Sequence, residues 1–399
     1  MAGGGTTQAV ERARVAVAVV FALNGLTFAS WISRLPAVRE ALGLSTSALG
    51  LLLLVGAMGS VLGLPLSGPI VARYGPARTV LGAALVVAAG LLLVAAGVAT
   101  GRVPLTGCGL FLLGLGIGTW DVGMNVEGAG VERRLERPLM PRFHAGFSLG
   151  TVAGAVLGAG AAALDVPVAA QLVLTGVLAT GLVAVGVRAF LPGEPVEPDA
   201  PAGLRVSAAW REPRTLLIGL LVLCFGFTEG TANDWLAIAL VDGHGTSEAV
   251  GALGFACFVS AMTASRTFGG ALLARYGRSP VLRATALTSV AGLLLVVLSS
   301  AVPLVVVGAL LWGAGAALGF PVGMSAAADD PHGAAVRVSV VSSIGYTAFL
   351  AGPPLVGLLA EPERLGVLQA LLVVLPALLV GALVAPRAAP VRSDGVPVP

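Results

Sequence analysis

The sequence predicts an all-α membrane protein with twelve transmembrane helices in two pseudo-symmetric six-helix bundles. Of its 399 residues, 57% are hydrophobic and 11% are charged, whereas soluble domains are about 45–50% apolar and about 25% charged. Apolar segments of about 20 residues, each long enough to cross a bilayer as a helix, recur along the chain. Short motifs of the first half also return in the second half, which indicates an internal duplication.

Charged and turn residues separate twelve apolar segments. The predicted spans are 13–33, 47–72, 78–99, 103–127, 143–164, 167–191, 214–240, 247–273, 279–301, 303–327, 335–360 and 363–386. The longest loop, 192–213, is rich in proline and charge and has no apolar periodicity, which is typical of a linker. We therefore expect an N-terminal bundle (1–191), a cytoplasmic linker (192–213) and a C-terminal bundle (214–399).

The arginines predict the orientation of the chain, since the sequence has no lysine. Eighteen arginines lie at the termini and in one alternating set of loops, and four lie in the opposite set: Arg34, Arg39, Arg102 and Arg364. By the positive-inside rule, both termini are cytoplasmic. The first apolar run is too long for a signal-peptide core. We expect it to be the first span of a multi-pass protein of the cytoplasmic (inner) membrane.

The repeat between the halves appears at two places. Residues 72–75 read Ala-Arg-Tyr-Gly, and the same four residues return at 274–277. Phe21 and Trp31 of the first span are similarly matched by Phe225 and Trp235 of the seventh. Such repeats place a binding site near the bilayer midplane between the halves, which rock to open it to alternate sides.

The repeated loop resembles the G-x-L-x-D-R-x-G-R signature of the major facilitator superfamily. The first copy matches it at Gly68, Ile70, Arg73, Tyr74 and Gly75, and the second copy matches it at Gly270, Leu272, Arg275, Tyr276, Gly277 and Arg278. Both copies have alanine in place of the aspartate, at Ala72 and Ala274. In the family this acid helps to latch the cytoplasmic gate, so the resemblance implies that the usual latch is altered here.

Three further stretches resemble a poorly characterised branch of that superfamily, close to the fucose-permease-like sugar transporters. They are GLGIGTWDVGMNVEGAGVERRLERPLMPRFHAGFSLG (114–150), EGTANDW (229–235) and GFPVGMSAAADDPH (319–332). The resemblance covers essentially the whole chain. It implies the fold of that superfamily and a sugar or another small polar metabolite as substrate.

Ionisable side chains inside spans cost free energy and are therefore candidates for function. Glu229, near the middle of the seventh span, is predicted to bind substrate or a proton, with structural pairing as the alternative. Asp234 lies about 140° around the helix from Glu229, so both face one cavity only if Gly230 breaks the helix. Arg266 needs a carboxylate partner or an anionic substrate group, and we expect a salt bridge that changes between states.

The fourth and fifth spans carry a second polar group. Asp121 and Asn125 share one glycine-lined face, which suits a cavity wall or a close helix crossing. Glu127 is expected to act in structure or gating by pairing with Arg142 or Arg133. His144 is expected to orient a gate, with proton relay as the alternative.

Aromatic and hydroxyl side chains share a face of the first span. Asn24, Thr27, Phe28 and Trp31 form it, and Trp235 matches Trp31 in the seventh span. Such a face can stack on and hydrogen-bond a sugar, although tryptophans also anchor spans at the membrane interface. A glycine at every fourth position of the fifth span, from Gly146 to Gly158, predicts close approach by another helix.

Together these patterns predict a proton-coupled secondary transporter that moves a sugar or similar metabolite by symport. The alternative is proton-driven efflux of amphipathic compounds. The sequence lacks a GxxxxGK[ST] motif and the common hydrolase motifs, so neither an ATPase motor nor an enzyme is expected. Cys108, Cys224 and Cys257 lie in apolar segments, which disfavours a disulfide framework or zinc site. We expect a monomer in the lipid bilayer, with a small-molecule substrate and a proton but no cofactor, metal or nucleic acid.

The predicted site residues fall into two overlapping sets. Substrate binding is assigned to Asn24, Thr27, Phe28, Trp31, Asp121, Asn125, Glu229 and Trp235. Proton coupling or gating is assigned to Glu229, Asp234, Asp121, Arg266, Glu127, Arg142 and His144.

Overall fold

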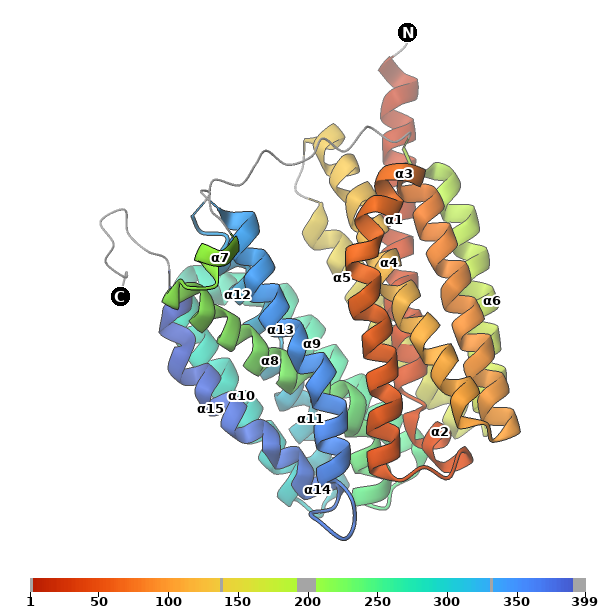
Figure 1. Ribbon diagram of the computed structural model, residues 1–399, viewed down its shortest axis with the longest axis vertical. Coiled ribbons are helices and arrows are strands. Elements are labelled where there is room, and N and C mark those ends of the chain that lie inside the picture. The colour runs from red at the N-terminus through yellow and green to blue at the C-terminus, as the bar shows by residue number, and fades with distance from the viewer. Residues whose placement is uncertain (1–2, 137–138, 192–205, 331–332, 390–399) are drawn as a thin grey trace. The chain divides into compact units, whose positions relative to one another are not determined.

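The structure, a computed structural model, describes residues 3–136, 139–191, 206–330 and 333–389, and these form helices without a β-strand (Figure 1). Residues 192–205 of the predicted linker lie outside the described residues. The longer helices are α1 (Gly3–Ile32), α3 (Thr46–Thr100), α4 (Val103–Leu135), α5 (Met140–Ala163), α6 (Val168–Gly186), α8 (Pro213–Ile238), α9 (Glu248–Tyr276), α10 (Arg278–Leu298), α11 (Val302–Ala316), α13 (Ala334–Leu359) and α15 (Val374–Val384). Shorter helices are α2 (Leu35–Ala41), α7 (Val206–Ala209), α12 (Gly319–Ala327), α14 (Val367–Ala370) and the one-turn elements η1 (Val187–Ala189), η2 (Ala239–Gly243), η3 (Leu371–Val373) and η4 (Ala385–Ala388).

Eleven helical segments of the described chain are long and apolar enough to cross a membrane. One of them, α3, has 55 residues and contains a non-helical residue, Gly75, with φ 76° and ψ 163°. Figure 1 shows α3 reversing direction near its middle. Its two limbs correspond to the predicted spans 47–72 and 78–99, so the prediction of twelve spans is confirmed.

Backbone conformation explains why the chain turns at Gly75. A positive φ is strained for residues with a Cβ but open to glycine, and the following Pro76 suits the first turn of a helix. The matching residue of the second half, Gly277, has φ 78° and ψ 168° and precedes α10. The arginine before each of these loops also lies over the ring of the next residue, Arg73 over Tyr74 at 5.5 Å and Arg275 over Tyr276 at 5.1 Å. The sequence repeat is therefore also a repeat of geometry.

The chain forms two compact units. Unit 1 comprises Met1–Glu197 with Thr246–Ala256, and unit 2 comprises Pro198–Gly245 with Cys257–Pro399. The first turns of α9 thus group with unit 1 and the remainder of α9 with unit 2. The domain boundaries expected from the sequence remain a prediction.

In unit 1, α5 packs closely on α1 along its glycine ridge. A Cβ added at Gly146 would lie 3.2 Å from the carbonyl oxygen of Ala18. At Gly150 and Gly154 an added Cβ would overlap the carbonyl groups of Ala22 and Leu26. The ridge therefore allows the close helix approach that the spacing predicts.

In unit 2, α8 packs against α12, α13 and α15. Its Phe225 is 1% exposed and fills the space over Gly319 and Gly381. Phe258 of α9 and Trp312 of α11 pack edge to face with ring centroids 6.0 Å apart. These aromatic contacts form the apolar core against which the polar residues of α8 are positioned.

The helix α4 continues to Leu135, beyond the predicted span end at 127. Apolar periodicity marks the membrane part of a helix, whereas glutamate and arginine continue a helix well outside the apolar layer. Arg133 and Arg134 in its last turn also complement the helix dipole.

Candidate functional site

An ion pair joins two spans of unit 2. Arg266 Nη2 on α9 donates a hydrogen bond of 2.8 Å to Glu229 Oε2 on α8. The side chain of Arg266 is 29% exposed and that of Glu229 is 14% exposed, so both are partly accessible to a small ligand. A mid-span arginine without a partner would be costly, and this pair meets that requirement with a group of opposite charge.

Arg266 also binds a backbone carbonyl at a break between helices. Its Nε donates a hydrogen bond of 3.1 Å to the carbonyl of Ala317, between the end of α11 and the start of α12. In a continuous helix this carbonyl would accept from the N–H four residues later, but that residue is Pro321, which has no N–H. Arg266 therefore occupies an acceptor that the sequence leaves free. The proline in GFPVGM was the available signal for this break, and the sequence interpretation missed it.

The other predicted residues of α8 lie away from this pair. The helix runs unbroken through Gly230, so Glu229 and Asp234 remain on different faces. Trp235 is completely buried, and its indole N–H has no acceptor among the described residues. Roles for Asp234 and Trp235 in binding or coupling remain predictions.

In unit 1, Asn125 Nδ2 donates to the backbone carbonyl of Asp121 at 2.8 Å and to its Oδ1 at 3.3 Å. On the same face of α4, Gly114 lies against the backbone of α3 at Gly56. Ser60 of α3 also donates a hydrogen bond of 3.1 Å to the Gly114 carbonyl. This end of the face is therefore a close helix crossing, while Asp121 and Asn125 are half-buried beyond it.

Glu127 is buried and connects α4 to the segment that follows η1. Its Oε1 accepts a hydrogen bond of 2.6 Å from the backbone N–H of Leu191, which follows η1. This bond replaces the expected pairing with Arg142 or Arg133, because the chain beyond α6 returns to α4 at this depth. Arg142 and His144 are exposed, and the His144 ring meets Phe21 edge to face at 5.2 Å.

The predicted aromatic face of α1 is mostly buried. Asn24, Thr27 and Trp31 are 1%, 0% and 4% exposed, and Phe28 is half-buried. Thr27 donates a hydrogen bond to the carbonyl of Leu23, whereas Asn24 Nδ2 has no acceptor among the described residues. A role in substrate binding remains a prediction for this face.

Arg34 is buried in unit 1 and contacts several residues there, whereas the sequence interpretation treated it only as a charge in a loop. It is 4% exposed and donates hydrogen bonds to Gln171 Oε1 and the Val166 carbonyl, each at 3.0 Å. Glu248 Oε2 lies 3.6 Å away. Burial lowers the pKa of Arg34, and the nearby Glu248 carboxylate partly offsets this effect.

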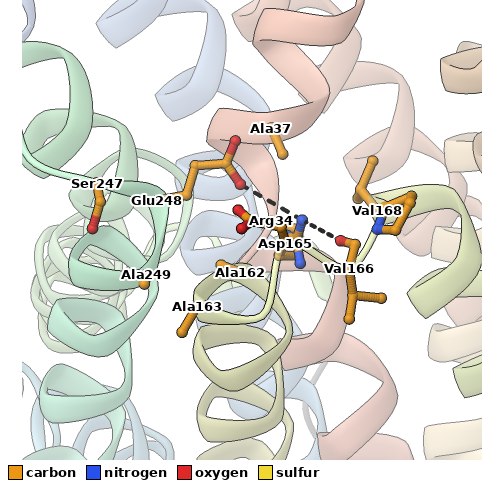
Figure 2. Close-up of a pocket in the computed structure, with 11 residues that line it drawn as sticks. Arg34, Ala37, Ala162, Ala163, Asp165, Val166, Val168, Ser247, Glu248 and Ala249 are labelled. Atoms are coloured by element: carbon orange, nitrogen blue, oxygen red, sulfur yellow. Dashed lines mark hydrogen bonds and ion pairs between the residues drawn. The ribbon is translucent and has the colours of Figure 1, made fainter.

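Arg34, Asp165 and Glu248 line a cavity of about 530 Å³ (Figure 2). The two terminal nitrogens of Arg34 bind Gln171 and Val166, and the rest of the lining is Ser247 and mostly apolar side chains. Only tertiary structure brings these residues together, because they come from the ends of α1, α5 and the start of α9.

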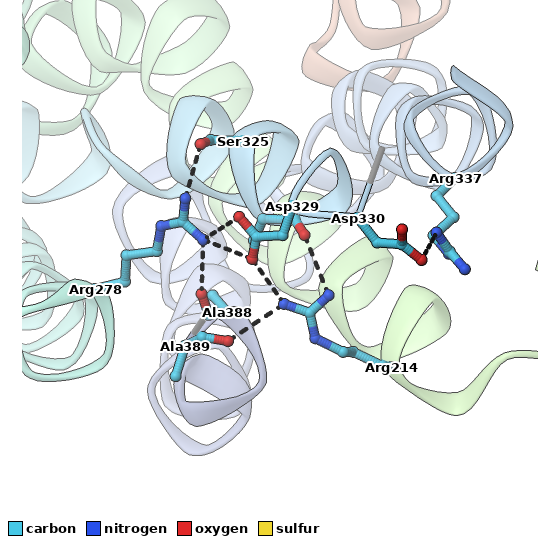
Figure 3. A network of polar contacts seen from close by, with 9 residues as sticks. Arg214, Arg278, Ser325, Asp329, Asp330, Arg337, Ala388 and Ala389 are labelled. Atoms are coloured by element: carbon cyan, nitrogen blue, oxygen red, sulfur yellow. Dashed lines mark hydrogen bonds and ion pairs between the residues drawn. The ribbon is translucent and has the colours of Figure 1, made fainter. Parts of the chain in front are cut away.

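The arginine-rich end of unit 2 holds a second group of charges. Figure 3 shows Arg214 and Arg278 converging on Asp329. Arg278 Nη1 lies 2.8 Å from both oxygens of Asp329, and Arg214 Nη2 lies 2.9 Å from Oδ2. The two arginines also donate to the carbonyls of Ala389 and Ala388, at 3.2 and 3.3 Å. Asp329 thus connects the starts of α8 and α10, and the two arginines connect both to the end of η4.

Beside this cluster, Arg337 forms a two-pronged pair with Glu212. Its Nε and Nη2 lie 2.7 and 3.0 Å from the two carboxylate oxygens, and its Nη1 reaches Asp330 at 3.0 Å. The hydrogen bond from Arg337 lowers the pKa of Glu212, outside the spans, below its ordinary value of 4.5. Arg278 belongs to the repeated signature, so Asp329 supplies it with a carboxylate where the signature residue is Ala274.

Comparison with known proteins agrees with this architecture. The Major Facilitator Superfamily profile matches residues 218–398. An uncharacterized transporter of Sinorhizobium fredii, y4wD, is 35% identical over 348 residues, which cover 86% of this chain and 90% of the relative.

Two solved structures share the fold. A mutant of the nucleoside transporter NupG has a TM-score of 0.78 at 12% identity, with 93% of this chain and 98% of that chain covered. The fucose:proton symporter FucP of E. coli has a TM-score of 0.62 at 15% identity, with 93% and 97% covered. The Sinorhizobium fredii relative and the family are transporters rather than enzymes. This chain belongs to the Major Facilitator Superfamily.

Proposed function

We propose that this protein is a secondary active transporter that moves a small, neutral polar metabolite such as a sugar by proton symport. It works by alternating access in the cytoplasmic membrane, as a monomer with both termini in the cytoplasm. The distribution of eighteen arginines against four supports this orientation. The single observation that carries the coupling is the Glu229–Arg266 pair.

The pair couples a proton to a ligand through the second contact of Arg266. When Glu229 takes up a proton, the charge attraction across the 2.8 Å contact is lost. Arg266 is still held by the carbonyl of Ala317, so it remains in position to bind a polar oxygen of the substrate. Proton and substrate then favour the same state, which is the requirement for coupled transport.

The substrate class is supported by the resemblance of residues 114–150, 229–235 and 319–332 to fucose-permease-like sugar transporters. A free sugar is a small, neutral and polar compound. The fold neighbours NupG and FucP are named for a nucleoside and for fucose with a proton, respectively.

The substrate is identified first by thermal unfolding of the purified protein with a ligand panel. The panel contains hexoses, polyols, nucleosides, organic acids and amphipathic cations. A ligand at a hundredfold its Kd stabilises the folded protein by about 2.7 kcal/mol. We expect stabilisation by a neutral polar metabolite, whereas stabilisation by amphipathic cations alone would favour proton-driven efflux.

Coupling is then tested in proteoliposomes with that ligand. Glu229→Gln should abolish uptake driven by a pH gradient but retain counterflow, because exchange of labelled for unlabelled substrate needs no net proton movement. Glu363→Gln makes the same exchange at an exposed position in the loop after α13, so it is the matched control and should retain both activities. If the Glu229→Gln variant still takes up substrate when a pH gradient is applied, Glu229 is not the proton carrier.

A further inference from the structure

Three aromatic side chains of unit 2 form a continuous group, which we call the aromatic triad: Phe320, Tyr346 and Phe349. The ring centroids of Phe320 and Tyr346 are 6.2 Å apart, and those of Tyr346 and Phe349 are 6.3 Å apart. Tyr346 and Phe349 lie three residues apart on α13, so they share a helix face. Phe320 lies in the first turn of α12. The triad therefore bridges two helices.

The exposure of the triad separates it from the other aromatic residues of unit 2. All three rings are half-buried. By contrast, Phe225 and Phe258 are at most 1% exposed within the core, and Phe268 is 71% exposed on the surface of α9. The triad is thus neither closed core nor outer surface, and its rings remain partly accessible.

Both ends of the triad adjoin the Glu229–Arg266 pair. A Cβ on Gly230, the residue next to Glu229, would lie 3.1 Å from Phe349 Cδ1. At the other end, Phe320 follows the helix break three residues after Ala317, whose carbonyl binds Arg266. The aromatic rings and the ion pair therefore belong to one continuous wall of unit 2.

The same wall has unused hydrogen-bonding groups. Asn233 lies one helical turn beyond Glu229 and on the same face. It is 9% exposed, and its Oδ1 has no donor among the described residues. The guanidinium of Arg266 uses Nε for Ala317 and Nη2 for Glu229, so its Nη1 has no described acceptor. A buried oxygen acceptor and a charged donor are thus available beside the rings.

We infer that the aromatic triad binds the flat face of a neutral ring compound whose polar edge meets Arg266, Glu229 and Asn233. Aromatic faces bind the flat faces of other rings and exclude water from the contact. Polar groups beside the aromatic rings then fix the orientation of the ligand. The ligand chemistry is a neutral ring with neighbouring hydroxyl groups, which a free sugar and a nucleoside share. This inference rests on the proposed function and adds to it the residues that select the substrate.

The test measures binding to the purified full-length protein, so it does not depend on the proton gradient. Glucose and fucose form one arm and uridine and adenosine the other, which distinguishes a free sugar from a nucleoside. Phe349→Leu retains apolar volume but removes the aromatic face. For the probe that binds the wild-type protein, we expect its Kd to rise by about tenfold or more, while the melting temperature without ligand stays close to that of the wild type.

Phe268→Leu is the matched control, since it makes the same exchange at an exposed position about 200° around α9 from Arg266 and should leave the Kd unchanged. Phe320→Leu tests the opposite end of the triad and should weaken binding as well, including where Phe349→Leu does not yield folded protein. Unchanged Kd values in the folded variants would overturn the triad but leave the proposed function standing. A wild-type protein that binds none of the four probes but does bind organic acids or amphipathic cations would overturn both.

Discussion

Gly75 and Gly277 have nearly the same backbone conformation, with φ and ψ of 76° and 163° at Gly75 and of 78° and 168° at Gly277. Each glycine follows the second span of its half and reverses the chain into the third. Residues with a Cβ pay about 1–3 kcal/mol in this region of positive φ and extended ψ, which is populated almost only by glycine. The repeat is therefore maintained by a backbone requirement as well as by side chains.

Replacing one of these glycines should destabilise the protein. We expect Gly277→Ala to lower the free energy of unfolding by about 1–3 kcal/mol, measured by thermal unfolding in detergent. The control is Gly82→Ala, in a helical part of α3 where an added Cβ meets no atom within 4 Å. This control should be neutral or slightly stabilising, since alanine favours helices. Equal losses in the two variants would contradict backbone strain as the cause.

The helix break at Ala317 should matter for transport more than for stability. Pro321→Ala supplies an N–H to the Ala317 carbonyl and so competes with Arg266 for that acceptor. We expect slower uptake in proteoliposomes with an unchanged or higher melting temperature. Pro303→Ala is the control, because Pro303 lies in the first turn of α11 where a missing N–H costs little. Wild-type uptake by Pro321→Ala would mean that the break is not needed.

Loss of the carboxylate at Asp329 should weaken the arginine-rich end of unit 2. Asp329→Asn leaves Arg214 and Arg278 facing each other without a shared negative charge. The three side chains are 21–31% exposed, so we expect a moderate loss of about 1–2 kcal/mol in the free energy of unfolding. Asp330→Asn, whose carboxylate is 53% exposed, should cost less than about 1 kcal/mol. The reverse order of the two losses would argue against Asp329 as the central residue.

Stability should depend on pH through Glu212. Because its pKa is lower in the folded protein than the ordinary value of 4.5, its contribution is complete above about pH 4.5 and disappears as the pH falls through the folded pKa. We expect the difference in melting temperature between the wild type and Glu212→Gln to be constant near neutral pH and to shrink below pH 4.5. A difference that stays constant into strong acid would show that the charge of Glu212 does not stabilise the fold.

Most of the fold could be predicted because the signals are local. A bilayer requires each span to satisfy its own backbone hydrogen bonds, so an apolar run of sufficient length specifies a helix without knowledge of its neighbours. The glycine spacing of α5 likewise predicted close packing, although it did not identify α1 as the partner. The position of Gly75 between two apolar runs separated two spans within one long helix.

The candidate site depended on contacts that no local pattern contains. The position of Arg266 within an apolar run predicts that it needs a partner, because a lone charge in a span is costly. Helix packing identifies that partner as Glu229, 37 positions away, and brings Glu127 to the backbone of Leu191. It also decided which aromatic residues lie beside the ion pair, since Phe320 and Phe349 come from different helices. Hydropathy specifies where a helix crosses the membrane, whereas packing against other helices sets its rotation and its neighbours.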